Sequence, residues 1–128
     1  LAVFPPEVSR ESRRSAAFRR AAMARLAETV RNDLARGPVL VAGDWNTPAR
    51  ISSLRPMRRL LDDAFRSGGA GWGNTVTSEF PVSRIDIIYV SDRFDVVHCA
   101  AIATDDSDHR MVLAELWLKA PESDQRGE

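Results

Sequence analysis

Three short polar clusters stand at the ends of apolar runs, and each carries residue types that can move a proton or hold a metal ion. They read Gly-Asp-Trp-Asn at 43–46, Arg-Ile-Asp at 84–86 and Ser-Asp-His at 107–109. Each adjoins a segment that we expect to form a buried strand, so strand ends could gather three acids, an amide and an imidazole into one pocket. Carboxylates bind hard metal ions, and imidazole exchanges protons near neutral pH. This set of groups suits the metal-assisted hydrolysis of a phosphate ester.

The first cluster places Asp44 directly after an expected strand at 39–43, with Asn46 two residues later. In an extended chain, residues two apart point the same way, so both side chains could reach one ligand. Asp44 could accept a proton from water, and the neutral amide of Asn46 could donate to a phosphoryl oxygen without adding repulsive charge. The alternative interpretation is a turn in which both side chains bond the local backbone.

The second cluster places Asp86 inside an otherwise apolar strand, where a carboxylate is costly to bury unless it is paired. Two kinds of partner are open. Arg84 lies two residues earlier on the same strand face and would make a structural ion pair with Asp86. A histidine would instead have its ring oriented by the carboxylate, which is a functional arrangement.

The third cluster places Asp108 and His109 just before the last expected strand. The two neighbours could divide the work, with the carboxylate on a metal ion and the imidazole on the reacting phosphate. A surface turn rich in acidic residues is the alternative. His98 stands mid-strand without polar neighbours, and we predict that it is a packed or edge residue rather than a ligand.

Three tryptophans have the flat ring needed to stack on a nucleic-acid base: Trp45, Trp72 and Trp117. We expect Trp117, in the last strand, to pack in the core. Trp72 lies in a glycine-rich segment at 67–74 that must be a loop, so it is the better candidate for contact with a ligand.

The length and composition indicate a single domain whose net charge creates no strong electrostatic field. At 128 residues the chain can bury a core, and its formal net charge is zero. Residues 9–36 carry eight arginines, but these are spread around the expected helix and predict a solvated face rather than a phosphate-binding stripe. The single cysteine, Cys99, excludes an intramolecular disulfide and a multi-cysteine zinc site. No apolar run approaches the ~20 residues of a membrane span.

Periodicity and turn residues predict a mixed α/β fold in which helices cover a sheet. Apolar residues recur at four-residue steps in the expected helix at 9–36, which a Gly-Pro pair ends. The run at 39–43 has no polar alternation, which is typical of a strand buried on both faces. The other expected elements are a helix at 53–65, strands at 84–90, 95–103 and 111–118, and a polar, frayed tail at 121–128. The first residues, from Leu1, look like the tail of a strand, so we expect the natural N-terminus to lie further upstream.

Taken in order, the segments at 39–48, 84–90 and 107–110 resemble the C-terminal half of the endonuclease/exonuclease/phosphatase superfamily. Its members include DNase I-like nucleases, inositol polyphosphate phosphatases and sphingomyelinases. Three motifs in the right order at strand ends are far more specific than any one of them. The resemblance implies an α/β (α+β) fold, namely half of a two-sheet DNase I-like β-sandwich flanked by helices, over residues 1–120.

The resemblance also implies Mg²⁺ or Mn²⁺, and hydrolysis of a phosphoester by activated water without a covalent enzyme intermediate. By motif match, Asp44 would position or deprotonate the water and contact the metal, and Asn46 would hold the scissile phosphate. Asp86 would orient His109, and Asp108 would bind the metal. His109 would bond a phosphate oxygen, stabilise the developing charge or act as base, and these roles stay open. The implied substrate is a nucleic acid, a phospholipid headgroup or a small phosphate ester, and no stable protein partner is implied.

The sequence departs from the superfamily pattern in two ways. The first half of the family domain carries a metal-binding Glu, an early Asn and a His, which are missing here, so we expect residues 1–128 alone to be inactive. Many relatives also have a Thr-Trp pair before the Arg-Ile-Asp strand, whereas Thr75 is followed here by Val76. The alternative function is a truncated or degenerate relative that binds a phosphorylated ligand or a protein without turnover. A serine hydrolase built on Ser107 is disfavoured, because no Gly-x-Ser-x-Gly elbow surrounds it.

Overall fold

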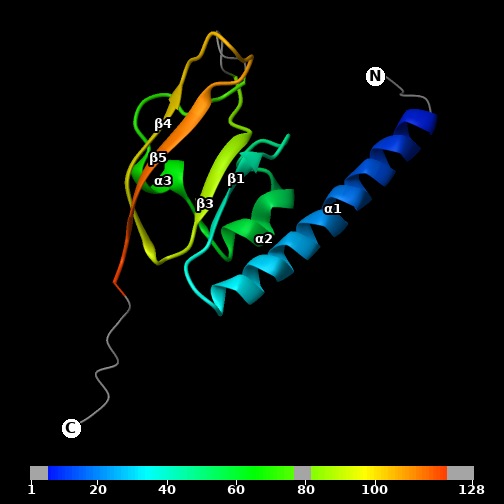
Figure 1. Cartoon of the computed structure of the whole chain (residues 1–128). Coiled ribbons are helices and arrows are strands. Elements are labelled where there is room, and N and C mark those ends of the chain that lie inside the picture. The colour runs from blue at the N-terminus through cyan, green and yellow to red at the C-terminus, as the bar shows by residue number, and fades with distance from the viewer. Residues whose placement is uncertain (1–5, 77–81, 121–128) are drawn as a thin grey trace.

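The computed structural model describes residues 6–76 and 82–120 (Figure 1). The expected strand remnant at the start and the expected tail at 121–128 lie outside the described residues. The elements follow one another as α1 (Pro6–Leu34), β1 (Leu40–Asp44), a 3₁₀ turn (Ser52–Leu54), α2 (Arg55–Arg58), β2 (Asp62–Asp63), α3 (Ala64–Gly68), β3 (Asp86–Val90), β4 (Phe94–Ile102) and β5 (Met111–Leu118).

Two antiparallel sheets form the centre of the molecule. In the first sheet β3 lies between β1 and β2, and the second consists of β4 and β5. Figure 1 shows α1 and α2 on one side of the first sheet and the β4–β5 sheet on its other side. The expected mixed α/β fold is therefore confirmed, and the strands expected at 84–90, 95–103 and 111–118 are β3, β4 and β5.

The main core lies between α1, α2 and the first sheet. Its most deeply buried side chains come from these elements and the 3₁₀ turn: Val30, Leu54, Met57, Ile87 and Tyr89. The helix expected at 9–36 is confirmed as α1, and none of the described helices has the length and apolarity of a membrane span. Only its C-terminal part is anchored, because Phe18, on the expected apolar stripe, is 75% exposed. Figure 1 shows the first turns of α1 extending away from the sheets.

The expectation that residues 39–43 form a strand buried on both faces is wrong. Within β1, Leu40 is 49% exposed and Ala42 is also exposed, whereas Val41 packs against the core. The reason is the position of the strand. β1 lies at an edge of the described sheet, and α1 covers only one of its faces. An apolar run therefore predicted the strand correctly but not what covers it.

The single helix expected at 53–65 is also wrong. The chain forms the 3₁₀ turn and the four-residue α2, then leaves the helical path at Asp62 and Asp63, which pair with Val90 and Tyr89 of β3. The Asp63 carboxylate accepts from the backbone N–H of Phe65 at 3.1 Å and so caps α3. Pairing with the sheet and capping outweigh the helical spacing of the apolar residues, as tertiary contacts often do.

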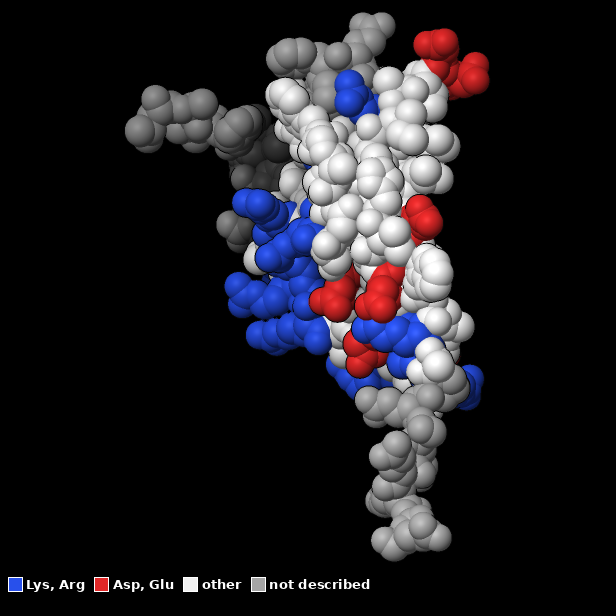
Figure 2. Space-filling model, turned by 90° about the vertical axis from the view of Figure 1, so that its left-hand side faces the viewer, with Lys and Arg blue, Asp and Glu red and all other residues white. Residues whose placement is uncertain are grey.

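The expected core position of Trp117 is wrong as well. Its side chain is 67% exposed on β5. Met111 and Leu113 of the same strand are each 49% exposed. Figure 2 shows that the face of the molecule bearing these strands has few charged side chains over its middle. The tryptophan that packs is Trp45. Its ring lies perpendicular to that of Tyr89 with the ring centres 5.3 Å apart, and its indole N–H donates to the Ile87 carbonyl at 3.2 Å.

A buried ion pair joins the start of β3 to β2. Arg84 donates to both carboxylate oxygens of Asp63, at 2.8 and 2.5 Å, and the two side chains are only 12% and 3% exposed. The Arg84 guanidinium also lies 5.3 Å from the ring centre of Phe65. A bidentate pair with both groups shielded from water fixes the segment before Asp86 in place.

Removal of the Asp63 carboxylate tests this anchor. Asp63→Ala should lower the free energy of unfolding by about 3 kcal/mol, because Arg84 is left buried and unpaired. Asp63→Asn keeps an acceptor for the α3 cap and should cost less. The free energy of unfolding is measured by urea titration. The exposed neighbour Asp62 provides the matched control, since Asp62→Ala should lower this free energy by less than about 0.5 kcal/mol. Equal losses for Asp62→Ala and Asp63→Ala would contradict the proposed anchor.

Candidate active site

Two carboxylates face each other across the β1–β3 pair. β1 ends at Asp44 and β3 begins at Asp86, and the register sets these two residues directly opposite. Residues opposite each other in antiparallel strands have Cβ atoms roughly 4.5–5.5 Å apart, and like charges there repel. The Asp86 side chain is 20% exposed and Asp44 is exposed. A positive group nearby would stabilise such a pair, so a cation is favoured at this place.

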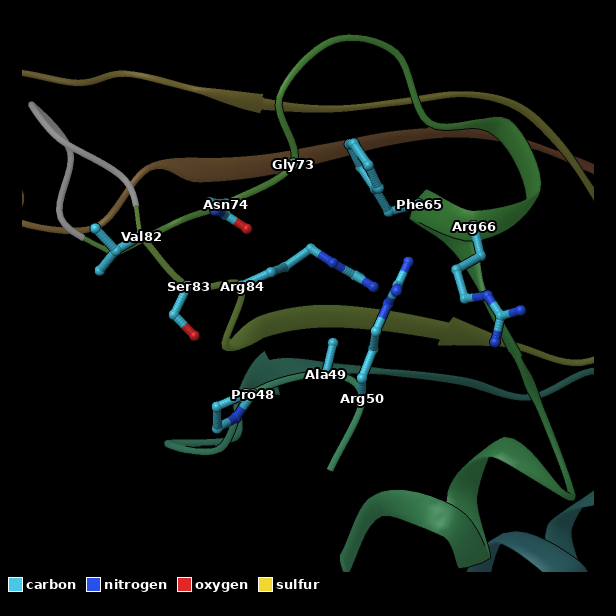
Figure 3. A pocket seen from close by; sticks show the side chains of 10 residues that line it. All are labelled: Pro48, Ala49, Arg50, Phe65, Arg66, Gly73, Asn74, Val82, Ser83 and Arg84. Carbon is cyan, nitrogen blue, oxygen red and sulfur yellow. The ribbon is translucent and has the colours of Figure 1, made fainter. Parts of the chain in front are cut away.

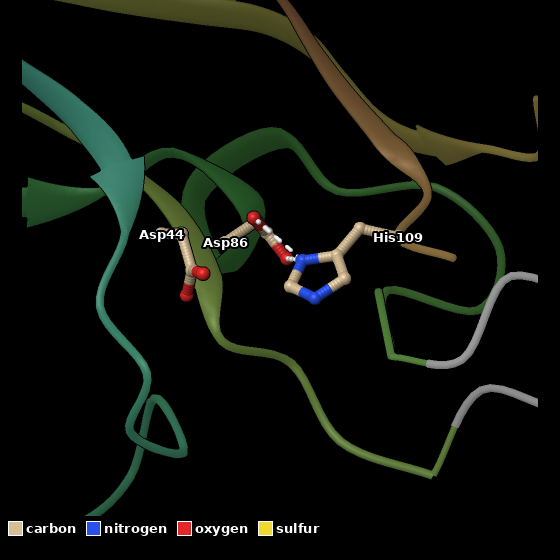
Figure 4. Close-up of side chains that lie close together, drawn as sticks. All are labelled: Asp44, Asp86 and His109. Carbon is tan, nitrogen blue, oxygen red and sulfur yellow. Dashed lines mark hydrogen bonds and ion pairs between the residues drawn. The ribbon is translucent and has the colours of Figure 1, made fainter. Parts of the chain in front are cut away.

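The imidazole of His109 reaches this pair from the turn before β5. Its Nδ1 atom lies 3.0 Å from Oδ2 and 3.2 Å from Oδ1 of Asp86 (Figure 4). Arg84 is engaged by Asp63 instead. Of the two partners left open for Asp86 by the sequence, the structure therefore selects the histidine.

This contact changes the proton affinity of the ring. The hydrogen bond to Asp86 raises the pKa of His109, partial desolvation lowers it, and the negative charges of Asp86, Asp108 and Asp44 raise it further, so that the net shift is upward. A raised pKa means that folding favours the protonated ring. Its stabilising effect is fully present below the pKa of an unfolded histidine and is lost as the pH rises through the folded-state pKa.

Thr75 bonds both the segment that carries Asp86 and the segment that carries His109. The sequence did not identify it as a site residue. Its buried hydroxyl accepts from the backbone N–H groups of Ile85, at 3.2 Å, and Asp86, at 3.3 Å. Its carbonyl accepts from the N–H of Arg110 at 2.8 Å, and the next residue forms a β-bridge with His109. The signal in the sequence is the Thr75-Val76 pair before the Arg-Ile-Asp strand, where many relatives have a Thr-Trp pair.

Asn46 lies in a turn rather than in the strand. Its backbone N–H donates to Oδ1 of Asp44 at 2.7 Å, and its φ is 46°, a left-handed conformation that asparagine tolerates. The argument that strand alternation aligns Asn46 with Asp44 is therefore wrong, because β1 ends at Asp44. The local turn, which was the alternative interpretation, is present.

The other candidates lie outside this group. Asp108 is exposed, and it acts on His109 through its charge. Trp72 is 67% exposed in the loop after α3, as expected of a side chain available to a ligand. His98 is exposed on β4. The hydroxyl of Ser107 accepts from the backbone N–H of His109 at 3.0 Å, so it closes the local turn.

The donor set fits a hard divalent cation. Asp44, Asp86 and His109 each offer one ligand atom, and these atoms lie within 4.8 Å of one another. The two carboxylates, with no thiolate beside them, match what magnesium and manganese accept in proteins. The imidazole is engaged by Asp86 and its pKa is raised, so it is better suited to donate a hydrogen bond than to bind the ion. The two opposed carboxylates supply a physical reason for a cation to bind there, because it removes their repulsion.

The chain belongs to the endonuclease/exonuclease/phosphatase family, whose model matches residues 3–109. The expected resemblance is thereby confirmed. Enzymes of this class act on phosphoesters and generally use divalent metal ions. Among curated proteins, no significant match to the chain was found.

Solved structures with the same fold agree with this assignment. A functionally unknown conserved protein from Enterococcus faecalis is 24% identical with a TM-score of 0.70, over 79% of this chain and 44% of that one. An endonuclease/exonuclease/phosphatase from Bacteroides vulgatus is 22% identical with a TM-score of 0.68, over 79% and 44%. A mannosyl-6-phosphatase from Bacteroides thetaiotaomicron is 24% identical with a TM-score of 0.63, over 74% and 44%. The chain thus spans under half the length of these structures and shares their DNase I-like fold.

The proton affinity of His109 provides a direct test of the site geometry. Asp86→Asn should lower the pKa of His109, since the hydrogen bond that raises it most is weakened and a negative charge is removed. The measurement is an NMR titration of the His109 ring in EDTA, with His98→Ala used to assign the two histidine signals. Asp105→Asn, an exposed acid in the same turn, should leave the pKa nearly unchanged. An unaltered pKa in Asp86→Asn would show that the two side chains do not pair in solution.

The role of Thr75 is tested by two substitutions of similar size. Thr75→Val leaves two partly buried N–H groups without their acceptor and should lower the free energy of unfolding by about 1–2 kcal/mol. Thr75→Ser keeps the hydroxyl and should restore most of the loss. Only Thr75→Val should also lower the His109 pKa, since Asp86 is then less well held. If valine and serine behave alike, the hydroxyl does not position the pair.

Proposed function

We propose that this chain contributes to the active site of a divalent-metal-dependent phosphoesterase that hydrolyses its substrate with activated water. The observation that carries the proposal is the convergence of Asp44, Asp86 and His109 within 4.8 Å. Membership of the endonuclease/exonuclease/phosphatase family supports the phosphoester class. Mg²⁺ or Mn²⁺ is the proposed ion, and when bound it polarises a phosphoryl oxygen and lowers the pKa of a water.

His109 is proposed to donate a hydrogen bond to a phosphate oxygen. Its Nδ1 faces Asp86, so Nε2 is the ring nitrogen left for a substrate (Figure 4). The raised pKa favours the imidazolium, which donates through both nitrogens and carries the charge needed to stabilise a developing phosphoryl anion. Asp86 then acts as the positioning residue that sets the ring orientation.

The remaining roles follow the chemistry of each side chain. Asp44 has an exposed carboxylate that can orient the attacking water and accept its proton. The neutral amide of Asn46 is proposed to hold the scissile phosphate. Asp108 is proposed as a further metal ligand, because its exposed side chain can turn toward the group of three. Trp72 is proposed to contact the organic part of the substrate.

The assay compares metal dependence with the loss of one imidazole. In the natural chain that contains residues 1–128, EDTA should abolish hydrolysis of p-nitrophenyl phosphate, bis-p-nitrophenyl phosphate or mannose 6-phosphate, and Mg²⁺ or Mn²⁺ should restore it. The sugar phosphate is included because one similar structure is a mannosyl-6-phosphatase. His109→Ala should lower kcat about 100-fold or more.

The chain contains its own control for this experiment. His98→Ala removes the other histidine of residues 1–128, which is exposed on β4, and should leave kcat within twofold. Undiminished activity in excess EDTA would rule out metal dependence. Phosphate binding without any turnover would favour the alternative of a binding module.

A further inference from the structure

A second, positively charged pocket lies beside the candidate active site. Its volume is about 590 Å³, within the range of pockets that bind small molecules. Four segments line it: the loop after β1 with Arg50, α3 with Phe65 and Arg66, the loop after α3 with Gly73 and Asn74, and the segment before β3 with Ser83 and Arg84. Figure 3 shows the Arg50 and Arg84 side chains extending into the same space. The pocket contains none of the three residues Asp44, Asp86 and His109, and the family assignment gives it no role.

The charges in the pocket do not cancel. Arg84 is neutralised by the buried Asp63 carboxylate. Arg50 and Arg66 are exposed, and within the described part of the chain no ion pair joins either of them to a carboxylate. Three arginines therefore line the pocket, and only Arg84 is paired with a carboxylate, which lies outside the lining. The Arg50 and Arg84 head groups approach each other, whereas that of Arg66 is turned away from them (Figure 3). The excess positive charge attracts anions to the pocket.

The pocket and the candidate active site are built from the same chain segments. Arg84 lies two residues before Asp86, so their Cα atoms are at most about 7 Å apart. Ala49, another lining residue, donates its N–H to the Arg84 carbonyl at 2.9 Å and follows Asp44 by five residues. A ligand bound in the pocket can therefore extend a neighbouring chemical group to the candidate active site.

We propose that this pocket binds a second phosphate group of the substrate while the scissile phosphate lies at Asp44, Asp86 and His109. The proposal rests on the proposed function and narrows the substrate to esters that carry at least two phosphates. Guanidinium groups bind phosphate oxygens through paired N–H donors, and the Ser83 hydroxyl adds a further donor. The second phosphate is either the next one along a nucleic-acid strand or the second one of a small bisphosphate.

The kinetic test compares substrates with one and two phosphates. One pair is glucose 1,6-bisphosphate against glucose 6-phosphate, and the other is a short single-stranded oligonucleotide against bis-p-nitrophenyl phosphate. In the double variant Arg50→Ala/Arg66→Ala, KM for the hydrolysed two-phosphate substrate should rise at least tenfold, and KM for its one-phosphate partner less than threefold. The pair in which the difference appears identifies the source of the second phosphate. Equal changes in both members of each pair, or none, would overturn the proposal.

The matched control removes two other exposed arginines. Arg55 and Arg59 line a separate hollow between α1 and α2, and Arg55→Ala/Arg59→Ala should leave every KM within twofold. If no substrate is turned over with any metal, the proposed function fails, and the pocket is then tested by calorimetric binding of glucose 1,6-bisphosphate and the oligonucleotide in EDTA. The Kd of the ligand that binds should rise at least tenfold in Arg50→Ala/Arg66→Ala and stay unchanged in Arg55→Ala/Arg59→Ala. Absent binding, or binding that this variant leaves intact, would show that the pocket holds no phosphate.

Discussion

The β1–β3 register is the constraint on which the candidate active site depends. It sets Asp44 opposite Asp86, and a slip of one residue would send one of the two side chains to the other face of the sheet. The register is held from the core side, where Trp45 bonds the Ile87 carbonyl and packs against Tyr89. Burial of the aromatic and apolar groups on one face thus offsets the repulsion of two acids on the other.

Two polar anchors then fix the start of β3. Asp63 holds Arg84 through a buried bidentate ion pair, and the Thr75 hydroxyl accepts the N–H groups of Ile85 and Asp86. Both anchors lie within two residues of the carboxylate that orients His109. Stability and site geometry are therefore coupled, because the same contacts that hold the chain together before β3 also set where the Asp86 carboxylate points.

In the proposed function, the two charged regions of the molecule divide the recognition of a phosphoester between them. The group formed by Asp44, Asp86 and His109 is acidic and attracts a cation. The neighbouring pocket gathers Arg50 and Arg66 with their charge uncompensated and attracts an anion. Because both arise from the loop after β1 and the segment before β3, the same short stretch of structure can bind the metal-bound phosphate and a second one.

The sequence by itself determined the main helix, β3, β4 and β5, because apolar periodicity is a local signal. It also singled out Asp44, Asp86 and His109, which the structure brings together, along with Asn46 and Asp108, which lie outside that group. Only the tertiary structure decided that Asp86 pairs with His109 while Arg84 pairs with Asp63, since the choice depends on elements far apart in the chain. Tertiary contacts also divide residues 53–65 into several short elements instead of one helix, and Trp117 is exposed because no element of the described structure covers it. Burial depends on which element covers a face, and no local pattern carries that information.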